Sequence, residues 1–331
     1  MDKIVLSEVA KAELRRSLQD LNLHPYEDIE TFLLSIYPIC ANLPWDVLRK
    51  LSEFRNDPRA YGALLLQNFP IDDNLPPTPS DGRLSKDKKT FISEACVLGV
   101  SQILGQPIGY HDEKAGDIIQ ALCPVKTEAH ATSSESSAVA LGFHTDFNFD
   151  NDNPDQPFNV LNPDYIILLS LRADRDGKAY TLYADARDIC KKLTLAQIDI
   201  IRRPLFQFAA SYSFTGKCGT DRIWSAPCPL LKGPVAFPEL SIDLLCGVRG
   251  LNEEATDMLN VLRRVCKLPD VATRVCLRPG DLLLIDNRKG AHARTAFTAY
   301  FDGGDRWLHR VYVRRSLWEL RQGAKAALRV F

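Results

Sequence analysis

Two residues near the middle of the chain, His144 and Asp146, have the types and spacing of metal ligands. If the stretch Gly142–Phe147 is a strand, alternate side chains share a face, so both residues would lie roughly 7 Å apart along the backbone. A distant histidine, His292, is the best candidate for a third ligand. Two histidines and one carboxylate leave half of an iron octahedron open for an organic co-substrate and dioxygen. Because about 0.8 His-x-Asp/Glu matches are expected by chance in such a chain, the context must support this assignment.

The overall composition excludes several classes of partner. The 331 residues are 45% hydrophobic and carry a formal net charge of -1, so a substantial core can form and no basic surface for nucleic acid or membranes is expected. The N-terminus lacks a basic region followed by a long apolar run, and no stretch approaches the ~18 apolar residues of a membrane span. We therefore expect a soluble, cytoplasmic protein whose partners are small molecules.

The cysteines and three further histidines are interpreted as structural residues without a role in the metal site. Nine cysteines are odd in number, scattered, and never spaced as Cys-x-x-Cys, which is typical of reduced, buried thiols rather than zinc ligands or disulfides. Cys228 and Cys246 are interpreted as small apolar fillers near the expected pocket. His24, His111 and His309 are interpreted as surface or packing residues.

The elements that position these residues begin with a helical scaffold over residues 1–116. Apolar residues recur at helical spacing from about 7 to 57, after a capping Ser7. Tyr61–Phe69 is a short apolar run typical of a buried strand, and the proline-rich segment that follows is a loop. A helix is predicted over Lys86–Leu104, ending at Gly105.

Strand-like segments dominate residues 117–313, with an insertion at about 185–270 and a C-terminal tail at 314–331. Helical periods within the insertion flank a glycine-bearing loop, Ser213–Arg222, that is long enough to act as a lid. The polar stretch Asn148–Asn153 is predicted to be a loop near the mouth of the site. The other expected elements are strands at Asp117–Cys123, Ala138–Leu141, Pro163–Arg172, Ala179–Tyr183, Ala272–Leu277, Asp281–Asp286 and Arg306–Val313, and helices at Thr194–Ile201 and Asn252–Cys266.

This succession predicts one mainly β domain with flanking helices. A turn at Gly177 between two apolar strands indicates a hairpin. Many short strands, with helices gathered at the start and in one insertion, favour a double-stranded β-helix or jelly-roll core. A polar turn, Thr132–Ser137, precedes the strand of the motif; it is either a solvated loop or a source of hydroxyl groups for a carboxylate ligand.

The last predicted strand carries two arginines on one face. Alternation places Arg306, Leu308, Arg310 and Tyr312 together. Buried arginines need anionic partners, and the planar guanidinium suits a carboxylate better than lysine does. The alternative is an exposed edge strand with solvated arginines, but the apolar neighbours on the same face favour the buried arrangement.

At this point the sequence resembles a known family. The motif His144-Thr-Asp146, the strand Pro163–Arg172, and the block from Gly280 through His292 to Arg310 look like the clavaminate synthase-like iron(II)/2-oxoglutarate oxygenases. That group belongs to the taurine dioxygenase-type superfamily and includes amino-acid hydroxylases of peptide-antibiotic biosynthesis. The resemblance covers roughly residues 117–313 and is most specific over 280–310.

The resemblance implies a role for each matched residue. His144, Asp146 and His292 match the iron ligands, and Arg306 matches the anchor of the co-substrate 2-oxoglutarate, which Thr181 is also expected to contact. Arg310 and Ser134 match residues that hold the substrate carboxylate, and Gln120 matches a glutamine that meets the substrate amino group. The implied reaction uses iron(II), 2-oxoglutarate and dioxygen to hydroxylate an unactivated C–H bond of a free amino acid or a derived small molecule.

Two departures from the family pattern affect the substrate side. Relatives usually carry glutamate where this chain has Asp146, and the shorter carboxylate reaches less far toward the substrate amine. Arginine hydroxylases have two acids near the position of Asp243, whereas only this one remains here. Asp221, in the expected lid, is a substitute acid if the substrate is basic.

Several alternatives remain at this stage. Desaturation or ring formation would start from the same hydrogen abstraction, whereas chlorination is disfavoured because halogenating relatives lack a carboxylate at the position of Asp146. A zinc-dependent hydrolase with the same three ligands is a second enzymatic class. A non-catalytic barrel that binds a small acid is a third. Dependence on oxygen and 2-oxoglutarate, and release of succinate, would distinguish them.

Overall fold

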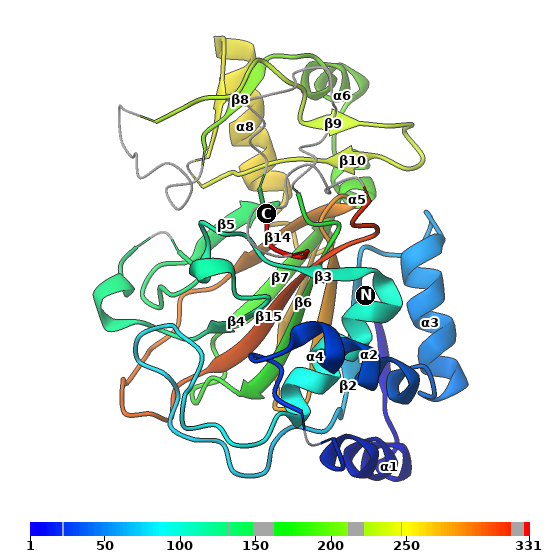
Figure 1. Ribbon diagram of the computed structural model, residues 1–331. Coiled ribbons are helices and arrows are strands. Elements are labelled where there is room, and N and C mark those ends of the chain that lie inside the picture. The colour runs from blue at the N-terminus through cyan, green and yellow to red at the C-terminus, as the bar shows by residue number, and fades with distance from the viewer. Residues whose placement is uncertain (22, 132, 148–161, 211–221, 246, 319–327) are drawn as a thin grey trace.

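Two antiparallel sheets form the centre of the protein, and helices cover them (Figure 1). The computed structural model describes residues 1–331 except 22, 132, 148–161, 211–221, 246 and 319–327. The larger sheet contains β1 (Asp2–Val5), β2 (Ala63–Gln67), β13 (Leu282–Asp286), β6 (Tyr165–Arg172), β15 (Trp307–Arg314) and β3 (Gln106–Ile108) in that order, with β4 (Ile119–Leu122) also paired to β15. The smaller sheet has the order β12 (Ala272–Cys276), β7 (Tyr180–Asp185), β14 (Gly290–Arg294) and β5 (Leu141–His144). Among the named strands of the described residues, β1 and β2 pair in parallel and the other pairs are antiparallel.

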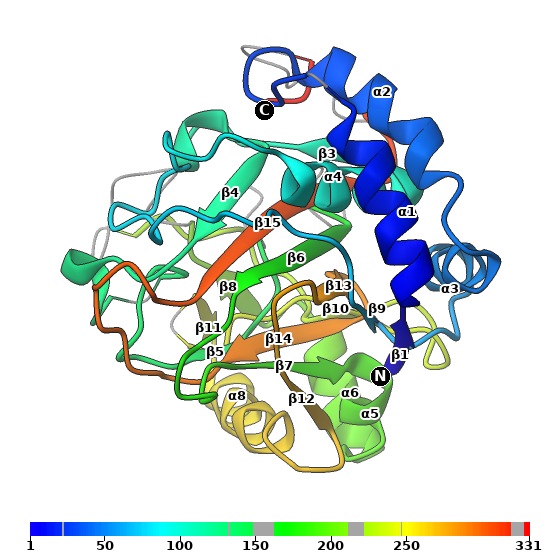
Figure 2. The ribbon, with the colours of Figure 1, turned by 90° about the horizontal axis from the view of Figure 1, so that it is seen from below.

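The strands of the larger sheet are apolar on both faces because both faces are covered. In β13, Leu282 and Leu284 pack toward the N-terminal helices, whereas Leu283 and Ile285 point into an inner core between the sheets. That inner core also includes Tyr183 of the smaller sheet. The two sheets therefore pack face to face, as the view from below indicates (Figure 2).

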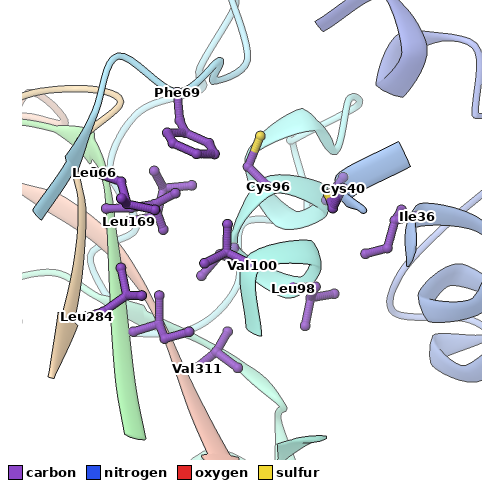
Figure 3. Packing of buried hydrophobic residues seen from close by; sticks show 14 of the residues in the cluster. Ile36, Cys40, Leu66, Phe69, Cys96, Leu98, Val100, Leu169, Leu284 and Val311 are labelled. Atoms are coloured by element: carbon purple, nitrogen blue, oxygen red, sulfur yellow. The ribbon is translucent and has the colours of Figure 1, made fainter. Parts of the chain in front are cut away.

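Four helices cover the outer face of the larger sheet: α1 (Glu8–Gln19), α2 (Ile29–Cys40), α3 (Trp45–Asn56) and α4 (Ile92–Leu104). Helix α4 lies between the sheet and α2, with Val100 among the strand residues and Leu98 and Cys40 on the side of α2 (Figure 3). Gly99 allows this close approach, since a Cβ atom there would lie 2.1 Å from the Cys40 sulfur. None of the described helices alone is long and apolar enough to cross a membrane, although α2 and α3 reach that length and composition as a pair bent by 118°.

Helix α4 begins six residues later than the apolar spacing predicts. The carboxylate of Asp72, from the preceding loop, accepts hydrogen bonds from the backbone amides of Ile92 and Ser93, both at 3.1 Å. Lys88 is buried between Asp72 and Glu94, at 2.6 and 2.5 Å. This ionic cluster holds residues 86–91 in a non-helical conformation that the local sequence does not reveal.

The insertion covers the outer face of the smaller sheet. Its described elements are α5 (Ala186–Cys190), α6 (Leu195–Arg202), β8 (Phe206–Phe208), β9 (Leu231–Lys232), β10 (Glu239–Leu240), β11 (Val248–Gly250) and α8 (Glu253–Val265). Small residues on the sheet, Ala184 and Ala291, pack into one core with Leu259 of α8. The predicted lid lies almost entirely outside the described residues, as does the predicted loop Asn148–Asn153.

Two predictions about the strands are wrong, one on a pairing and one on where a strand begins. The hairpin across Gly177 does not form, because β6 pairs with β13 and β15 whereas β7 pairs with β12 and β14 in the other sheet. Gly177 does turn the chain, with φ +65°. The strand expected at Ala138–Leu141 is displaced, since β5 begins only at Leu141. Both strands next to Gly177 are largely buried, so alternation alone does not identify their partners.

Candidate metal centre

His144, Asp146 and His292 lie together at one end of the smaller sheet. Strands β5 and β14 are antiparallel neighbours, and His144 is directly opposite His292 in their register. The ring centroids of the two histidines are 4.2 Å apart. One potential ligand atom from each of the three residues lies within 4.8 Å of the others. The sequence-predicted triad is therefore assembled by residues up to 148 positions apart in the chain.

Asp146 is held by hydrogen bonds to Asn287 and not by the strand alternation that the sequence predicted. Strand β5 ends at His144, so the two-residue strand period does not apply to Asp146. Instead, the side chain of Asn287 accepts a hydrogen bond from the Asp146 backbone amide at 2.9 Å and donates one to its carbonyl at 3.0 Å. Phe147 then adopts φ +57°, and its ring packs on Tyr110 and Tyr312 at 4.6 and 5.3 Å between centroids. Sequence reasoning missed Asn287 because no local pattern relates it to the motif.

The free atoms of the triad fit a metal ion. Nδ1 of His144 donates to the carbonyl of Gly142 at 2.8 Å, which directs Nε2 toward Asp146 Oδ1 at 3.5 Å. Metal-bound histidines commonly donate their second N–H in this way. Oδ2 of Asp146 and Nδ1 of His292 are buried and have no hydrogen-bond partner among the described residues. Because such atoms are costly to leave unpaired, the donor set suits a divalent cation.

The three groups differ in proton affinity. Burial lowers the pKa of His144, but the hydrogen bond and negative charge of Asp146 outweigh that effect and raise the pKa to about 9. Burial and repulsion from His144 lower the pKa of His292 to about 3. The carboxyl of Asp146 has its pKa held well below the usual value by the two histidines, although burial acts in the opposite direction.

We expect a divalent metal ion to displace about one proton when it binds at pH 7, because a histidine must be neutral to ligate. The proton comes from His144, which is charged in the metal-free protein at that pH. Affinity should accordingly rise about tenfold per pH unit up to about pH 9 and then level off. Calorimetry of Mn²⁺ binding in buffers with different ionisation enthalpies counts the protons. Binding without proton release would contradict the expected charge state.

Substitution of Asn287 by alanine should weaken metal binding by about 10- to 100-fold, the usual cost of losing support for a ligand. The change removes both hydrogen bonds to the Asp146 backbone and one to the carbonyl of Pro163. Asn252→Ala is the matched control, because Asn252 caps α8 and does not contact the site. That control should lower the unfolding free energy by about 1 kcal/mol while leaving Mn²⁺ affinity unchanged. Equal losses of affinity in both variants would refute the positioning role.

Arg310, which is predicted to hold the substrate carboxylate, acts electrostatically on Asp146. Arg310 is on the inner face of β15, opposite Gln120 of β4, and its Nε donates to Gln120 Oε1 at 2.9 Å. Its charge acts on both Asp146 and His292. Glu113, which sequence reasoning did not select, forms an ion pair with Arg310 at 2.5 Å. It lies in a loop with no periodic pattern, so no sequence signal indicates its partner.

The loop that carries Ser134 is fastened to β14 by a buried arginine. Arg294, two residues after His292, donates to the hydroxyl of Ser136 at 2.8 Å and to the carbonyl of Val139 at 2.9 Å. Ser134 itself is half-buried. Burial and the charge of Arg306 lower the pKa of Arg294 to about 9. These contacts fasten Ser136 and Val139 to β14.

Arg306 is the clearest candidate for an anion site. Only 7% of its surface is exposed, yet its guanidinium makes no hydrogen bond or ion pair with the described part of the chain. Burial lowers its pKa to about 10, although Asp174 partly offsets this effect. Thr181, the second predicted co-substrate contact, is buried on β7 directly opposite Arg294. Arg306 acts electrostatically on Arg294, and a buried cation without a polar partner favours binding of a carboxylate.

Of the two acids predicted to contact the substrate, Asp243 lies among the described residues. Asp243 forms an isolated bridge with His144, and its charge contributes to the raised pKa of that histidine. It therefore lies beside the candidate metal ligands. Asp221 falls outside the described residues.

Comparisons with known proteins agree with this arrangement. The family model for "Taurine catabolism dioxygenase TauD, TfdA family" matches residues 241–312. The chain is 30% identical over 312 residues to L-lysine 3-hydroxylase of Catenulispora acidiphila, covering 94% of this chain and 83% of the relative. It is 33% identical over 309 residues to clavaminate synthase 2 of Streptomyces clavuligerus, covering 91% and 89%. The structure of asparagine oxygenase with Fe(II), 2S,3S-3-hydroxyasparagine and succinate superposes with a TM-score of 0.86 and 28% identity, over 100% of this chain and 99% of that chain.

Proposed function

Because the chain belongs to the clavaminate synthase-like TauD/TfdA iron(II)/2-oxoglutarate oxygenases, we propose that it hydroxylates an unactivated C–H bond of a free amino acid or an amino-acid-derived small molecule. The observation that carries the proposal is the His144, Asp146 and His292 cluster. The printed names of an L-lysine hydroxylase and an asparagine oxygenase support the substrate class. We place the reaction in natural-product biosynthesis and in the cytoplasm.

We assign the two facing sheets to a double-stranded β-helix, the jelly-roll core expected for this family. Their shared inner core and the likeness to asparagine oxygenase support this assignment. The whole of residues 1–331 would then be one oxygenase domain, with a helical scaffold over 1–116, a core over 117–313 and a tail over 314–331. The insertion at about 185–270 closes the outer face of the smaller sheet.

The three clustered residues would hold iron(II) on one side and leave the opposite side open. When bound, iron supplies the oxidation: 2-oxoglutarate and dioxygen give succinate and carbon dioxide, and one oxygen atom enters the substrate C–H bond. Arg306 would anchor the far carboxylate of 2-oxoglutarate, with Thr181 beside it. The buried position of Arg306 excludes water from this contact, which strengthens the charge interaction.

Arg310 serves a second anion, the carboxylate of the substrate. Arg310 lies within β15 and acts on Asp146, whereas Arg306 precedes that strand and acts on Arg294, so we assign the two guanidinium groups to separate ligand groups. Ser134 and Gln120 offer additional polar groups near this position. Asp243, beside His144, would meet a polar side chain on the substrate.

The proposal is tested by measuring succinate release with free amino acids in the presence of iron(II), 2-oxoglutarate, ascorbate and oxygen. We expect one or more amino acids to stimulate succinate formation and to yield a product heavier by one oxygen atom. A product lighter by two hydrogens would instead identify a desaturase or cyclase. A zinc hydrolase would retain activity without oxygen and 2-oxoglutarate, and a binding module would hold the amino acid without forming succinate. Any of these three results would refute the proposed hydroxylation.

A further inference from the structure

The guanidinium of Arg306 lies against the aromatic ring of Phe297. Its central carbon is 5.8 Å from the ring centroid, and both residues are only 7% exposed. A guanidinium at this separation is attracted by the partial negative charge of the ring face. Because Arg306 makes no hydrogen bond or ion pair with the described part of the chain, this ring contact is the short-range attraction that acts on its head group before a ligand binds.

The backbone that carries Arg306 is held independently of the ring contact. The carboxylate of Asp305, the preceding residue, accepts hydrogen bonds from the amides of Tyr300 and Phe301 at 2.8 and 2.6 Å. The carbonyl of Asp305 accepts a hydrogen bond from the hydroxyl of Thr78 at 2.7 Å. The residue after Arg306 begins β15. The backbone is thus fixed, whereas the long side chain has several rotatable bonds that these contacts do not restrict.

Phe297 is fastened to the loop that precedes β5. Its backbone amide donates to the carbonyl of Ser137 at 2.9 Å. Its ring also lies 5.1 Å from the guanidinium carbon of Arg294. Arg294 in turn donates to the hydroxyl of Ser136 at 2.8 Å and to the carbonyl of Val139 at 2.9 Å. The backbone and the ring of Phe297 are therefore both tied to one loop, and the ring face offsets part of the repulsion between the two buried arginines.

An aromatic ring suits this position better than an acidic side chain would. A carboxylate ligand binds arginine through two parallel N–H groups. A neighbouring acid would occupy such donors and repel the ligand, whereas a ring attracts the charge and leaves the donors free. Asp174, which acts on Arg306 through its charge, accepts hydrogen bonds from the backbone amides of Lys178 and Ala179 instead. The contact with Phe297 therefore restricts the guanidinium without blocking it.

We propose that Phe297 is a positioning residue that holds the Arg306 guanidinium at a fixed distance from the metal centre and thereby selects oxo diacids of the length of 2-oxoglutarate. This inference rests on the proposed function, because the co-substrate must meet the metal at one end and Arg306 at the other. A guanidinium that is held fits one chain length, whereas a free one can follow a longer acid. Holding the group before the ligand arrives also lowers the conformational entropy that binding must remove.

The test measures how the length of the oxo diacid affects its binding to the Mn²⁺-loaded protein without oxygen. Calorimetry would compare 2-oxoglutarate with 2-oxoadipate, which is one methylene longer, and the wild-type protein should prefer 2-oxoglutarate. Phe297→Leu should lose about 5- to 30-fold in affinity for 2-oxoglutarate, as expected for a buried cation–π contact, and less for 2-oxoadipate. Phe297→Tyr, which keeps the aromatic face, should retain most of the preference. The affinity for Mn²⁺ should be unchanged in both variants.

The matched control is Phe54→Leu. Phe54 is also buried, but it packs on Tyr165 in the core under the N-terminal helices, so its loss should lower the unfolding temperature without changing the preference between the two acids. Phe297→Met is the second replacement if Phe297→Leu does not fold.

The inference is overturned if removal of the Phe297 ring keeps the wild-type preference, if it weakens the binding of both acids equally, or if Phe297→Tyr loses as much affinity as Phe297→Leu. If amino acids stimulate succinate release but any of these results is found, only this inference fails. If the wild-type protein binds neither acid and releases no succinate, the proposed function fails with it.

Discussion

Replacing His292 with alanine should lower metal affinity by more than about 100-fold, since each ligand of a protein metal site contributes roughly 3 kcal/mol. Substrate-dependent succinate release should fall at least as far, because the metal supplies the oxidation. His292 faces His144 across two adjacent strands, and its unpaired Nδ1 is buried. No other histidine is in the cluster formed by the described residues. Affinity for Mn²⁺ and the rate of succinate release would be measured on the same preparation.

The control for this prediction is His111→Ala. His111 is a surface residue whose side chain is 59% exposed, so its loss should change neither metal affinity nor turnover. Added imidazole should partly restore metal binding to the His292→Ala protein, because the substitution leaves a space beside two intact ligands. Normal turnover by His292→Ala would refute the assignment of the centre. A loss of metal affinity and turnover in both variants would instead indicate a general effect of histidine removal.

Much of the candidate site was predictable because its residues have distinctive chemistry. The triad and the two arginines were selected from residue type and spacing together with the family resemblance, and the structure brings His144, Asp146 and His292 together. The alternation predicted for the last strand is confirmed from Trp307 onward, since Leu308 and Tyr312 lie in the inner core and Trp307 lies on the opposite face, whereas Arg306 precedes the strand.

The supporting contacts were not predictable, because they join segments that are distant in sequence. Asn287 holds Asp146 across 141 positions, and Glu113 reaches Arg310 across 197. Neither side chain stands out by type or period. The predicted strand pairing at Gly177 is wrong for the same reason. The sequence indicates the turn there, but the chain passes from one sheet to the other, so β6 and β7 do not pair. Local rules identify a turn or an apolar face, whereas register depends on which faces meet in the folded protein.

The second large effect is expected at Arg306. Arg306→Met keeps most of the side-chain length but removes the charge. We expect KM for 2-oxoglutarate to rise by roughly 30- to several thousand-fold, because truncation of one partner of a buried charge pair costs about 2–5 kcal/mol. Arg306→Lys should give an intermediate loss, because lysine lacks the planar fork. The matched control is Arg172→Met: Arg172 donates to the carbonyls of Gly303 and Pro76 at 2.9 and 3.1 Å, so its loss should lower stability without changing KM.

Thermal unfolding separates this binding role of Arg306 from a structural one. The guanidinium is buried without a hydrogen-bond or ion-pair partner among the described residues, and its pKa is lowered to about 10 by burial, so the charged form opposes folding. Arg306→Met should therefore unfold at a higher temperature than the wild-type protein when 2-oxoglutarate is absent. Addition of 2-oxoglutarate at 100 times its Kd should stabilise the wild-type protein by about 2.7 kcal/mol and leave the variant almost unchanged. A variant that is less stable without 2-oxoglutarate, yet stabilised by it as strongly as the wild type, would show that Arg306 supports the fold and does not anchor the co-substrate.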